Sequence, residues 1–397
     1  MQIPLSRPDI SEHEREAVLA VLQTPHLALG PRLDEFERRM AAYCERRFAV
    51  AVNSGTSALH LAMLAMDVQP GDEVVTTPFS FVASTNCILY VGGTPRFVDI
   101  DPDDWNLDAR LLSGALSTRT RGVLPVHVFG LPCDMAAVMG FARRHELWVV
   151  EDACEAIGAY DREGLVGRAA QATVLAFYPN KQMTTGEGGM LLTDDEATAL
   201  KCRSWRNQGR GEDGAWLSHV RLGYNYRLSD INAALGIAQL QRLDDLLLKR
   251  ARVAAWYDER LAGEPRLRSQ RLADGRHKSW FVYVVKLDDE FTRADRDAVL
   301  EELRGHGIGC SNYFTPIHLQ PFIQERFGLR RGMFPVCEAV ADRTIALPFF
   351  GSLRENQVET VCRRLRQALD AAGRRERSLP AAARVVPQAA GDLKGEV

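Results

Sequence analysis

FYPNKQMTTGEGG, residues 177–189, begins where the apolar run 173–176 ends and centres on Lys181. The apolar run is typical of a buried strand, so the lysine is expected at a strand's end, between an aromatic-proline step and a Gly-rich turn. An amine placed there can form a Schiff base with an aldehyde, which is how proteins tether pyridoxal phosphate (PLP). A lone loop lysine is more often simply solvated, so the interpretation depends on the rest of the chain.

NSGTS, residues 53–57, lies between a strand-like run (48–52) and a helix-like run. At a helix N-terminus, free N–H groups and the positive end of the dipole attract an anion. Gly55 permits the tight turn, and Thr56 and Ser57 add hydroxyl donors, which suits a phosphate. The same residue types cap ordinary helices, so this segment alone favours capping.

Two further residues supply the remaining parts of a PLP site. Asp152 ends the apolar run 147–152, and a carboxylate there can keep the pyridine nitrogen protonated, as the cofactor's electron-sink chemistry requires. Capping of the following turn explains Asp152 equally well. Phe81, in TPFSFVA (77–83), is a candidate ring to stack on the cofactor, although Phe79 and Phe81 also fit a core.

Strand-like runs alternate with helical patterns from about residue 47 to 193, which predicts a mainly parallel α/β sheet. Several residues of interest follow the carboxyl ends of these runs, where open α/β sheets bind ligands. The expected strands are 48–52, 73–76, 95–99, 122–126, 148–151, 173–177 and 189–192.

Together these segments resemble the DegT/DnrJ/EryC1/StrS family, the sugar aminotransferases among fold-type I PLP enzymes. Ordered agreement over so many segments is far more specific than any one of them. The matching blocks, which span nearly the whole chain, are 30–31, 36–37, 53–57, 78–83, 151–159, 177–189, 206–210, 223–227, 313–322 and 346–348. The resemblance implies a fold-type I PLP-dependent transferase, with a mainly parallel seven-stranded sheet between helices and a smaller C-terminal α+β domain.

The resemblance also implies residue roles. Lys181 is the lysine that carries the cofactor and acts as general acid and base, Asp152 pairs with the pyridinium, and Phe81 stacks on the ring. Asn225 would reach the phosphate of the neighbouring subunit's cofactor, so a homodimer with shared active sites is expected. The phosphate in the same subunit would be held by Gly55, Thr56 and Ser57.

Three family-variable positions bear on the chemistry. Glu155 stands where relatives often have Gln or His near the cofactor hydroxyl, and a carboxylate there must be protonated or find a donor. Ala176 replaces a phosphate-binding Ser of many relatives, so one hydroxyl donor is missing. Relatives that dehydrate a keto sugar replace the lysine with His, so the retained Lys181 favours transamination.

Substrate contacts rest on positions that are similar to the family's sugar pocket. Tyr313 and His318 are expected to line this pocket, although a loop His beside Pro is more often exposed. Arg227 is expected to help with anionic groups. The segment 206–210 and Trp216 are candidates to approach a nucleotide diphosphate, with solvated surface as the alternative.

Composition limits the class of protein. The chain has 397 residues, 46% of them hydrophobic, and a net charge of −3 with acids and bases interspersed, so we expect a soluble globular protein without a nucleic-acid partner. Its eight cysteines show no CxxC pair or Cys/His ligand spacing, which predicts neither a disulfide framework nor a metal site. No secretory signal or membrane-spanning run is evident, so the cytoplasm is the expected location.

Domain organisation follows from a long apolar-faced helix expected after Asp230 with Ser229 as N-cap. We expect a large PLP-binding domain with the N-terminal segment at 1–245, a small C-terminal α+β domain at 246–373 and a flexible tail at 374–397. In the small domain, a strand is expected at 280–285 and helices at 293–306 and 355–372.

The expected activity is a ping-pong transamination. L-glutamate donates its amino group, pyridoxamine phosphate is the intermediate form of the cofactor, and a nucleotide-linked keto-6-deoxy sugar accepts at C4 rather than C3. The donor and the carbon rest on the resemblance alone. Two alternatives remain open: a cyclitol or aminobenzoate-type aminotransferase of the same family, and a PLP-binding regulatory protein without turnover.

Overall fold

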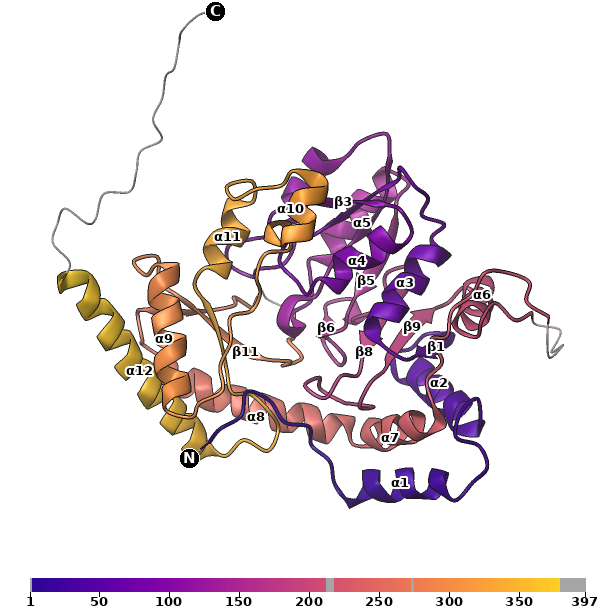
Figure 1. The fold of residues 1–397 in the computed structure, drawn as a ribbon, viewed down its shortest axis with the longest axis horizontal. Coiled ribbons are helices and arrows are strands. Elements are labelled where there is room, and N and C mark those ends of the chain that lie inside the picture. Colours follow the sequence, from indigo (N-terminus) through magenta and orange to yellow (C-terminus); the bar gives the residue numbers. More distant parts are fainter. Residues whose placement is uncertain (1, 212–217, 273–274, 379–397) are drawn as a thin grey trace, which may run out of the picture.

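A computed structural model describes residues 2–211, 218–272 and 275–378 of the chain (Figure 1). A seven-stranded sheet lies at the centre of its larger part. The strands are β1 (Phe48–Val52), β2 (Glu73–Thr76), β3 (Thr94–Phe97), β4 (Thr120–Leu124), β5 (Trp148–Asp152), β8 (Ala172–Ala176) and β9 (Gly189–Thr193).

The sheet has the order β1–β9–β8–β5–β4–β2–β3. Neighbours from β8 to β3 are parallel, whereas β9 runs antiparallel to both β1 and β8. The prediction of a mainly parallel seven-stranded sheet is therefore confirmed, with small shifts at the strand ends. A short hairpin of β6 (Tyr160–Asp161) and β7 (Gly164–Leu165) follows β5.

Both faces of the sheet are covered by helices. Neighbouring strand residues such as Val149 and Val150 belong to different buried clusters because side chains alternate between the two faces. This burial on both sides explains the nearly continuous apolar runs in the sequence. One face carries α3 (Gly55–Ala65), α4 (Ala83–Tyr90) and α6 (Glu196–Arg206), and the other carries α2 (Pro31–Tyr43), α5 (Met135–Arg144) and α7 (Asp230–Gln241).

The single long helix expected after Asp230 is two helices. α7 ends at Gln241, and α8 (Leu243–Leu261) begins after Arg242, whose φ of −110° and ψ of 8° lie outside the helical region. The Arg242 side chain donates to Glu14 Oε1 at 2.6 Å and to Asp9 at 3.0 Å, which fixes α1 (Glu12–Leu22) beneath α7. Figure 1 shows α7 and α8 end to end along the lower edge, above α1. The apolar pattern runs through the break, which is why the sequence predicted one helix.

The C-terminal part forms a smaller α+β unit. Its apolar cluster joins α8 to the three-stranded sheet β10–β11–β12 and to the last helices. Figure 1 shows α9 beside α12 on the side away from the large sheet. The elements are β10 (Leu267–Ser269), β11 (Tyr283–Leu287), α9 (Arg293–Gly305), the short 3₁₀ helix η3 (Ile317–Leu319), α10 (Pro321–Phe327), α11 (Pro335–Ala341), β12 (Thr344–Leu347) and α12 (Glu355–Ser378). Two further 3₁₀ helices, η1 (Ala109–Ala115) and η2 (Val128–Gly130), belong to the larger part.

Two boundaries in this unit differ from the sequence-based expectation. The strand expected from residue 280 begins at Tyr283, and α12 continues to Ser378, so residues 374–378 are helical where a flexible tail was expected. Residues 379–397 lie outside the described residues. The domain limits at 245 and 373 stay predictions. Among the described residues, no helix combines the length and apolar composition that a bilayer crossing requires.

Candidate active site

The carboxyl ends of β5 and β8 lie side by side because the two strands are parallel neighbours. Asp152 is the last residue of β5, and the segment with Lys181 follows β8 directly. The N-terminus of α3 approaches the same edge. A Cβ on Gly189, the first residue of β9, would lie only 2.3 Å from the Ser54 carbonyl oxygen. The structure thus brings together three segments that the sequence singled out separately.

Lys181 points its amine into a largely buried environment. The side chain is 13% exposed, and Nζ lies 3.5 Å from Glu155 Oε1. The ring of Phe281, itself buried, lies 3.9 Å from the same nitrogen, measured to the ring centroid. An amine confined between a carboxylate and an aromatic face has a defined position, unlike the solvated lysine that a lone loop residue suggests.

The segment that carries Lys181 is held from below by α7. Asn232 Nδ2 donates to the Thr185 carbonyl, and Gln239 Oε1 accepts the Thr184 N–H at 3.2 Å. Both hydrogen bonds are made to the main chain of the lysine segment. Gln239 also donates to Glu14 Oε1 at 2.9 Å, so the hydrogen bonds continue into α1.

Asp152 is 4% exposed and receives two hydrogen bonds. Ser84 Oγ donates to Oδ2 at 2.8 Å, and the Cys154 N–H donates to Oδ1 at 3.2 Å. Ser84 lies on α4, one helical turn after Phe81, and its hydroxyl is also 3.2 Å from the Phe81 carbonyl oxygen. The carboxylate is therefore oriented, and the residue expected to stack on the cofactor ring lies close to it in the fold.

Glu155 has the donors that the sequence left open. Its Oε2 accepts the Phe129 N–H at 2.9 Å, and its Oε1 faces the Lys181 amine. Burial raises the pKa of Glu155, and the nearby Asp152 acts in the same direction, whereas Lys181 and the Phe129 N–H oppose the rise. Phe129 adopts a left-handed conformation with φ of 58°, unusual for an aromatic residue, and this conformation directs its N–H at Glu155.

The segment at the start of α3 has the shape of an anion site. Ser54 is the N-cap, and its Oγ accepts the Ser57 N–H at 3.0 Å, while Ser57 Oγ donates to Asn53 at 2.7 Å. A Cβ on Gly55 would lie 2.7 Å from the Cβ of Ala176, so only glycine allows this turn to pack flat on the strand end. The first N–H groups of a helix have no partner within it, and because the cap takes the Ser57 N–H, those of Gly55 and Thr56 are the ones that can bind a phosphate.

A cavity of about 380 Å³ opens beside this turn. His60 forms part of its wall, with Nδ1 3.1 Å from the Tyr226 hydroxyl, and burial lowers the pKa of His60. Its lining combines hydroxyls with aromatic rings: Ser54, Thr56, Ser57, His60, Tyr90, Tyr224 and Tyr226. The size and polarity suit a phosphate group, so the residues present fit the phosphate end of PLP.

Phe81 and Tyr313 reach the site from other elements. Phe81 is 62% exposed, which is unusual for a large aromatic residue. This exposure leaves its ring free to stack on another ring. Tyr313 stacks against Phe129 at 6.4 Å between ring centroids. Burial raises the pKa of Tyr313, and the charge of Glu155 acts in the same direction.

His318 is not presented to a substrate in this structure. Its side chain is 0% exposed, and Nε2 lies 2.9 Å from Glu338 Oε1. Burial lowers the pKa of His318, although Glu338 opposes this shift. The sequence allowed a pocket residue or an exposed loop residue, and the structure gives neither, because α11 packs its carboxylate against the imidazole.

The segment 206–210 was a candidate to approach a nucleotide diphosphate, and its first residue, Arg206, does not have this role in the structure. Arg206 is buried and forms an ion pair with Glu37, and it also donates to the Ala51 carbonyl at 2.7 Å. Its guanidinium is therefore committed to holding α6 against β1 and is not available to a nucleotide. Trp216 lies outside the described residues.

Asn225 and Arg227 lie close to the anion site of their own chain. The carbonyl of Asn225, an exposed residue, accepts the Asn53 side chain at 3.4 Å, and Arg227 donates to Asn207 Oδ1 at 3.1 Å. Their proposed roles toward a neighbouring subunit and a substrate stay predictions, as do the roles of the other site residues.

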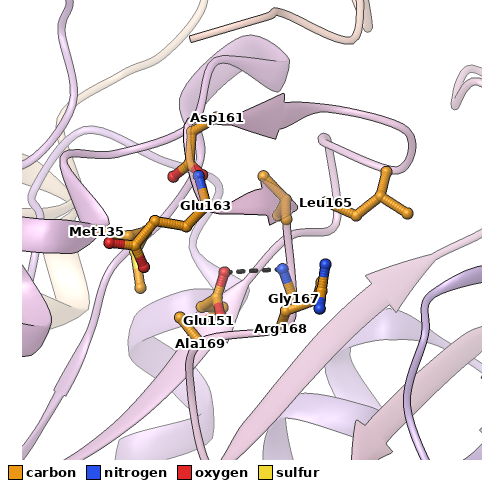
Figure 2. Close-up of a pocket in the computed structure, with 9 residues that line it drawn as sticks. Met135, Glu151, Asp161, Glu163, Leu165, Gly167, Arg168 and Ala169 are labelled. Atoms are coloured by element: carbon orange, nitrogen blue, oxygen red, sulfur yellow. Dashed lines mark hydrogen bonds between the residues drawn. The ribbon is translucent and has the colours of Figure 1, made fainter. Parts of the chain in front are cut away.

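A second cavity, of about 210 Å³, lies beside the β6–β7 hairpin (Figure 2). Glu151 reaches this side because it precedes Asp152 on the strand and points to the opposite face of the sheet. It accepts the Gly167 N–H at 3.1 Å and the Ala170 N–H at 3.2 Å, and it also bonds His127 at 3.0 Å. Glu151 thus secures the segment that follows the hairpin, and the described residues hold no cluster of ligands for a metal ion.

Sequence reasoning missed four residues of the site. Ser84 could have been suspected, since it is a hydroxyl residue three positions after Phe81 on a helix. Phe129, Phe281 and Gln182 carry no such signal. Gln182 joins the lysine segment to the C-terminal part by donating to Ser279 Oγ at 2.9 Å.

A second lysine lies near the same site. Lys278 Nζ donates to Gln270 Oε1 at 2.7 Å and lies 4.5 Å from the Trp280 ring centroid. Burial lowers the pKa of Lys278 to about 7, against the attraction of Asp258 and Glu155.

Lys278 should make the stability depend on pH. Because lysine in the unfolded chain titrates near 10.5, the unfolded state binds more protons than the folded state between pH 7 and 10. The buried charge of Lys278 therefore lowers the free energy of unfolding by its full amount below pH 7, and this destabilisation decreases as the pH rises to 10. We expect Lys278→Met to raise the melting temperature at pH 7, and this advantage should shrink toward pH 10 in thermal scans. A difference that stays constant over this range would contradict the assigned shift.

Comparison with known proteins agrees with the geometry. The model of the DegT/DnrJ/EryC1/StrS aminotransferase family matches residues 8–366. The spore coat polysaccharide biosynthesis protein SpsC of Bacillus subtilis is 36% identical over 380 residues, 93% of this chain and 98% of the relative. The GDP-perosamine synthase of Caulobacter vibrioides is 38% identical over 371 residues, with the same coverage of 93% and 98%.

Solved structures show the same fold. The putative sugar aminotransferase Spr1654 of Streptococcus pneumoniae in its PMP form superposes with a TM-score of 0.91 at 26% identity, covering 95% of this chain and all of the other. The PseC aminotransferase of Helicobacter pylori gives 0.89 at 27% identity, with 94% and 100% covered. Spr1654 also has a PLP form. The predicted fold type and the predicted cofactor are thus confirmed at the level of the family, and the chain belongs to the DegT/DnrJ/EryC1/StrS aminotransferases.

Proposed function

We propose that this protein moves the amino group of L-glutamate onto a nucleotide-linked keto-6-deoxy sugar, with PLP as cofactor. The observation that carries the proposal is the partly buried Lys181 amine, which faces Glu155 at the sheet edge where Asp152 and the N-terminus of α3 also lie. An amine, an oriented carboxylate and a helix N-terminus match the aldehyde, the ring nitrogen and the phosphate of PLP.

Each part of this arrangement has a chemical task. When bound, PLP supplies an electron sink for the carbanion at the α-carbon of an amino acid. Lys181 Nζ is the base that takes the α-proton from glutamate. Asp152 would hold the ring N–H, and Phe81 would stack on the ring face. Glu155 faces the lysine amine and limits its movement.

The names of the relatives support a sugar as the acceptor. One is called a GDP-perosamine synthase, one a polysaccharide biosynthesis protein and one a putative sugar aminotransferase. We propose a nucleotide sugar for this chain on that basis. Amination at C4 rather than C3, and glutamate as donor, rest on the family resemblance.

We also propose a homodimer with shared active sites. Asn225 is exposed, and its carbonyl accepts the Asn53 side chain at the edge of the anion site, so this residue is placed to reach a second copy of the chain. Light scattering on the purified protein tests this assembly, and a mass near the 44.2 kDa of one chain would contradict it.

The activity is tested one half-reaction at a time. With PLP bound, glutamate should release one equivalent of 2-oxoglutarate per subunit without any acceptor. UDP-, dTDP- and GDP-linked 6-deoxy sugars with the keto group at C4 or at C3 are then added separately, and the aminated product is detected by mass and its carbon assigned by NMR.

The outcomes separate the alternatives. Release of 2-oxoglutarate followed by amination only of a keto-cyclitol would favour the cyclitol branch of the family. PLP binding without any release of 2-oxoglutarate, with alanine and glutamine tested as further donors, would favour a regulatory protein.

A further inference from the structure

Arg250 is a buried guanidinium whose hydrogen-bond partners among the described residues are backbone carbonyls. It lies on α8, is 4% exposed, and forms no ion pair with any of the described residues. Its NH2 group donates to the carbonyls of Lys181 at 2.7 Å and Asn180 at 3.2 Å, and its NH1 group donates to those of Phe281 at 3.1 Å and Trp280 at 3.4 Å.

This placement is costly. Burial lowers the pKa of Arg250 to about 10, and the charge of Asp9 opposes this shift. Other buried arginines of the chain are ion-paired: Arg206 with Glu37, and Arg296 with Asp297. A cation kept here without a carboxylate needs a different explanation from theirs.

The four carbonyls belong to two segments that meet at the candidate active site. Lys181 is 69 positions before Arg250, and Phe281 is 31 positions after it. The same two residues touch through their side chains, since the Lys181 amine lies over the Phe281 ring at 3.9 Å. A planar fork of donors can join two backbones in one plane, which the single ammonium of a lysine cannot do.

We propose that Arg250 is a positioning residue for the Lys181 amine. By joining the backbone of the lysine segment to the backbone of Phe281, it sets the distance between them and keeps Nζ between the Phe281 ring and the Glu155 carboxylate. Arg250 touches neither cofactor nor substrate in this proposal. The proposal rests on the proposed function, in which Lys181 is the reactive amine, but its first test does not use the reaction.

The first test measures the amine itself, in protein freed of PLP. Arg250→Met and Arg250→Lys are compared with the unaltered protein by brief acetylation with acetic anhydride, and mass spectrometry gives the rate at Lys181 relative to surface lysines. Both variants are expected to label roughly tenfold faster, because the amine loses its contacts with the Phe281 ring and the Glu155 carboxylate, which shield it from the reagent. Arg250→Lys keeps the positive charge but lacks the planar guanidinium. If it raises the labelling rate as much as Arg250→Met does, the guanidinium geometry and not the charge positions Lys181.

Arg296 offers a matched control. It is also buried, and its NH1 group donates to the carbonyls of Ala341 at 3.0 Å and Thr344 at 3.3 Å, within the C-terminal unit. Arg296→Met should lower the melting temperature as Arg250→Met does, yet leave the labelling of Lys181 unchanged. If Arg250→Met proves insoluble, Arg250→Lys carries the test alone. Unchanged labelling in the soluble Arg250 variants would overturn the proposal.

The second test uses the loaded protein. Arg250→Lys should lower kcat roughly 100-fold, as expected when a reacting group is displaced by about 1 Å, while KM for glutamate changes little. The visible circular dichroism of the bound cofactor should weaken in parallel. If Arg250→Lys has the same kcat as the unaltered protein, the proposal for Arg250 is wrong. If the unaltered protein itself shows no turnover, the proposed function is wrong, and the role of Arg250 is then decided by the labelling experiment alone.

Discussion

Replacement of Lys181 by Ala is expected to abolish amino transfer, with a fall in kcat of at least about 10⁴ that combines lost covalent attachment and lost general-base catalysis. Purified protein with PLP should show a visible absorption band that glutamate bleaches, and Lys181→Ala should lack this band or show it shifted. The reason is geometric: the amine 3.5 Å from Glu155 is the nucleophile that the described site presents beside Asp152 and the start of α3.

Lys278→Met is the matched control for this experiment. Lys278 is also a partly buried amine near Glu155, with a pKa lowered to about 7, so it is the residue that could mimic Lys181 toward an aldehyde. We expect this variant to keep the band and its response to glutamate. If Lys181→Ala kept both and Lys278→Met lost them, the assignment of the reactive lysine would be wrong.

Replacement of Asp152 by Asn should have the second largest effect. Asn has nearly the same shape and can still accept the Ser84 hydroxyl that now lies 2.8 Å from Oδ2, so the fold should survive. The negative charge that keeps the ring nitrogen protonated is lost, and with it the electron sink. We expect kcat to fall by roughly 10²–10³, the usual scale for losing one electrostatic contact to developing charge.

Ser84→Ala separates charge from orientation at the same carboxylate. It removes one hydrogen bond to Asp152 but keeps the charge, so its effect on kcat should be about tenfold, in line with roughly 1.4 kcal/mol. Stopped-flow absorbance after mixing with glutamate gives both rates. An Asp152→Asn protein as fast as Ser84→Ala would show that the ring nitrogen does not need an anionic partner here.

Much of this architecture follows from local sequence patterns. Continuous apolar runs predict strands buried on both faces, and a glycine between a strand and a helix predicts the turn at Gly55. Such signals depend on neighbours in the chain. They are strong at the ends of β1, β5 and β8, where the residues expected to bind the cofactor lie.

What the sequence could not predict depends on contacts between distant segments. Nothing near Glu155 indicates that a left-handed Phe129 supplies an N–H to its carboxylate. The burial of His318 depends on Glu338 in α11, twenty residues away. Arg250 binds carbonyls, which every residue possesses, so no pattern of residue types marks its targets. The break at Arg242 likewise arises from packing against α1 rather than from a helix-breaking residue.

Three side chains from the α7 and α8 helices hold the lysine segment through its main chain, and this has a practical consequence for directed evolution. The hydrogen bonds of Asn232, Gln239 and Arg250 go to amide and carbonyl groups of that segment, which are the same whatever side chains it carries. Tyr178, whose side chain is 52% exposed, can therefore be randomised in a mutant library without loosening the support of the lysine. Selection for new acceptor sugars should begin at such positions.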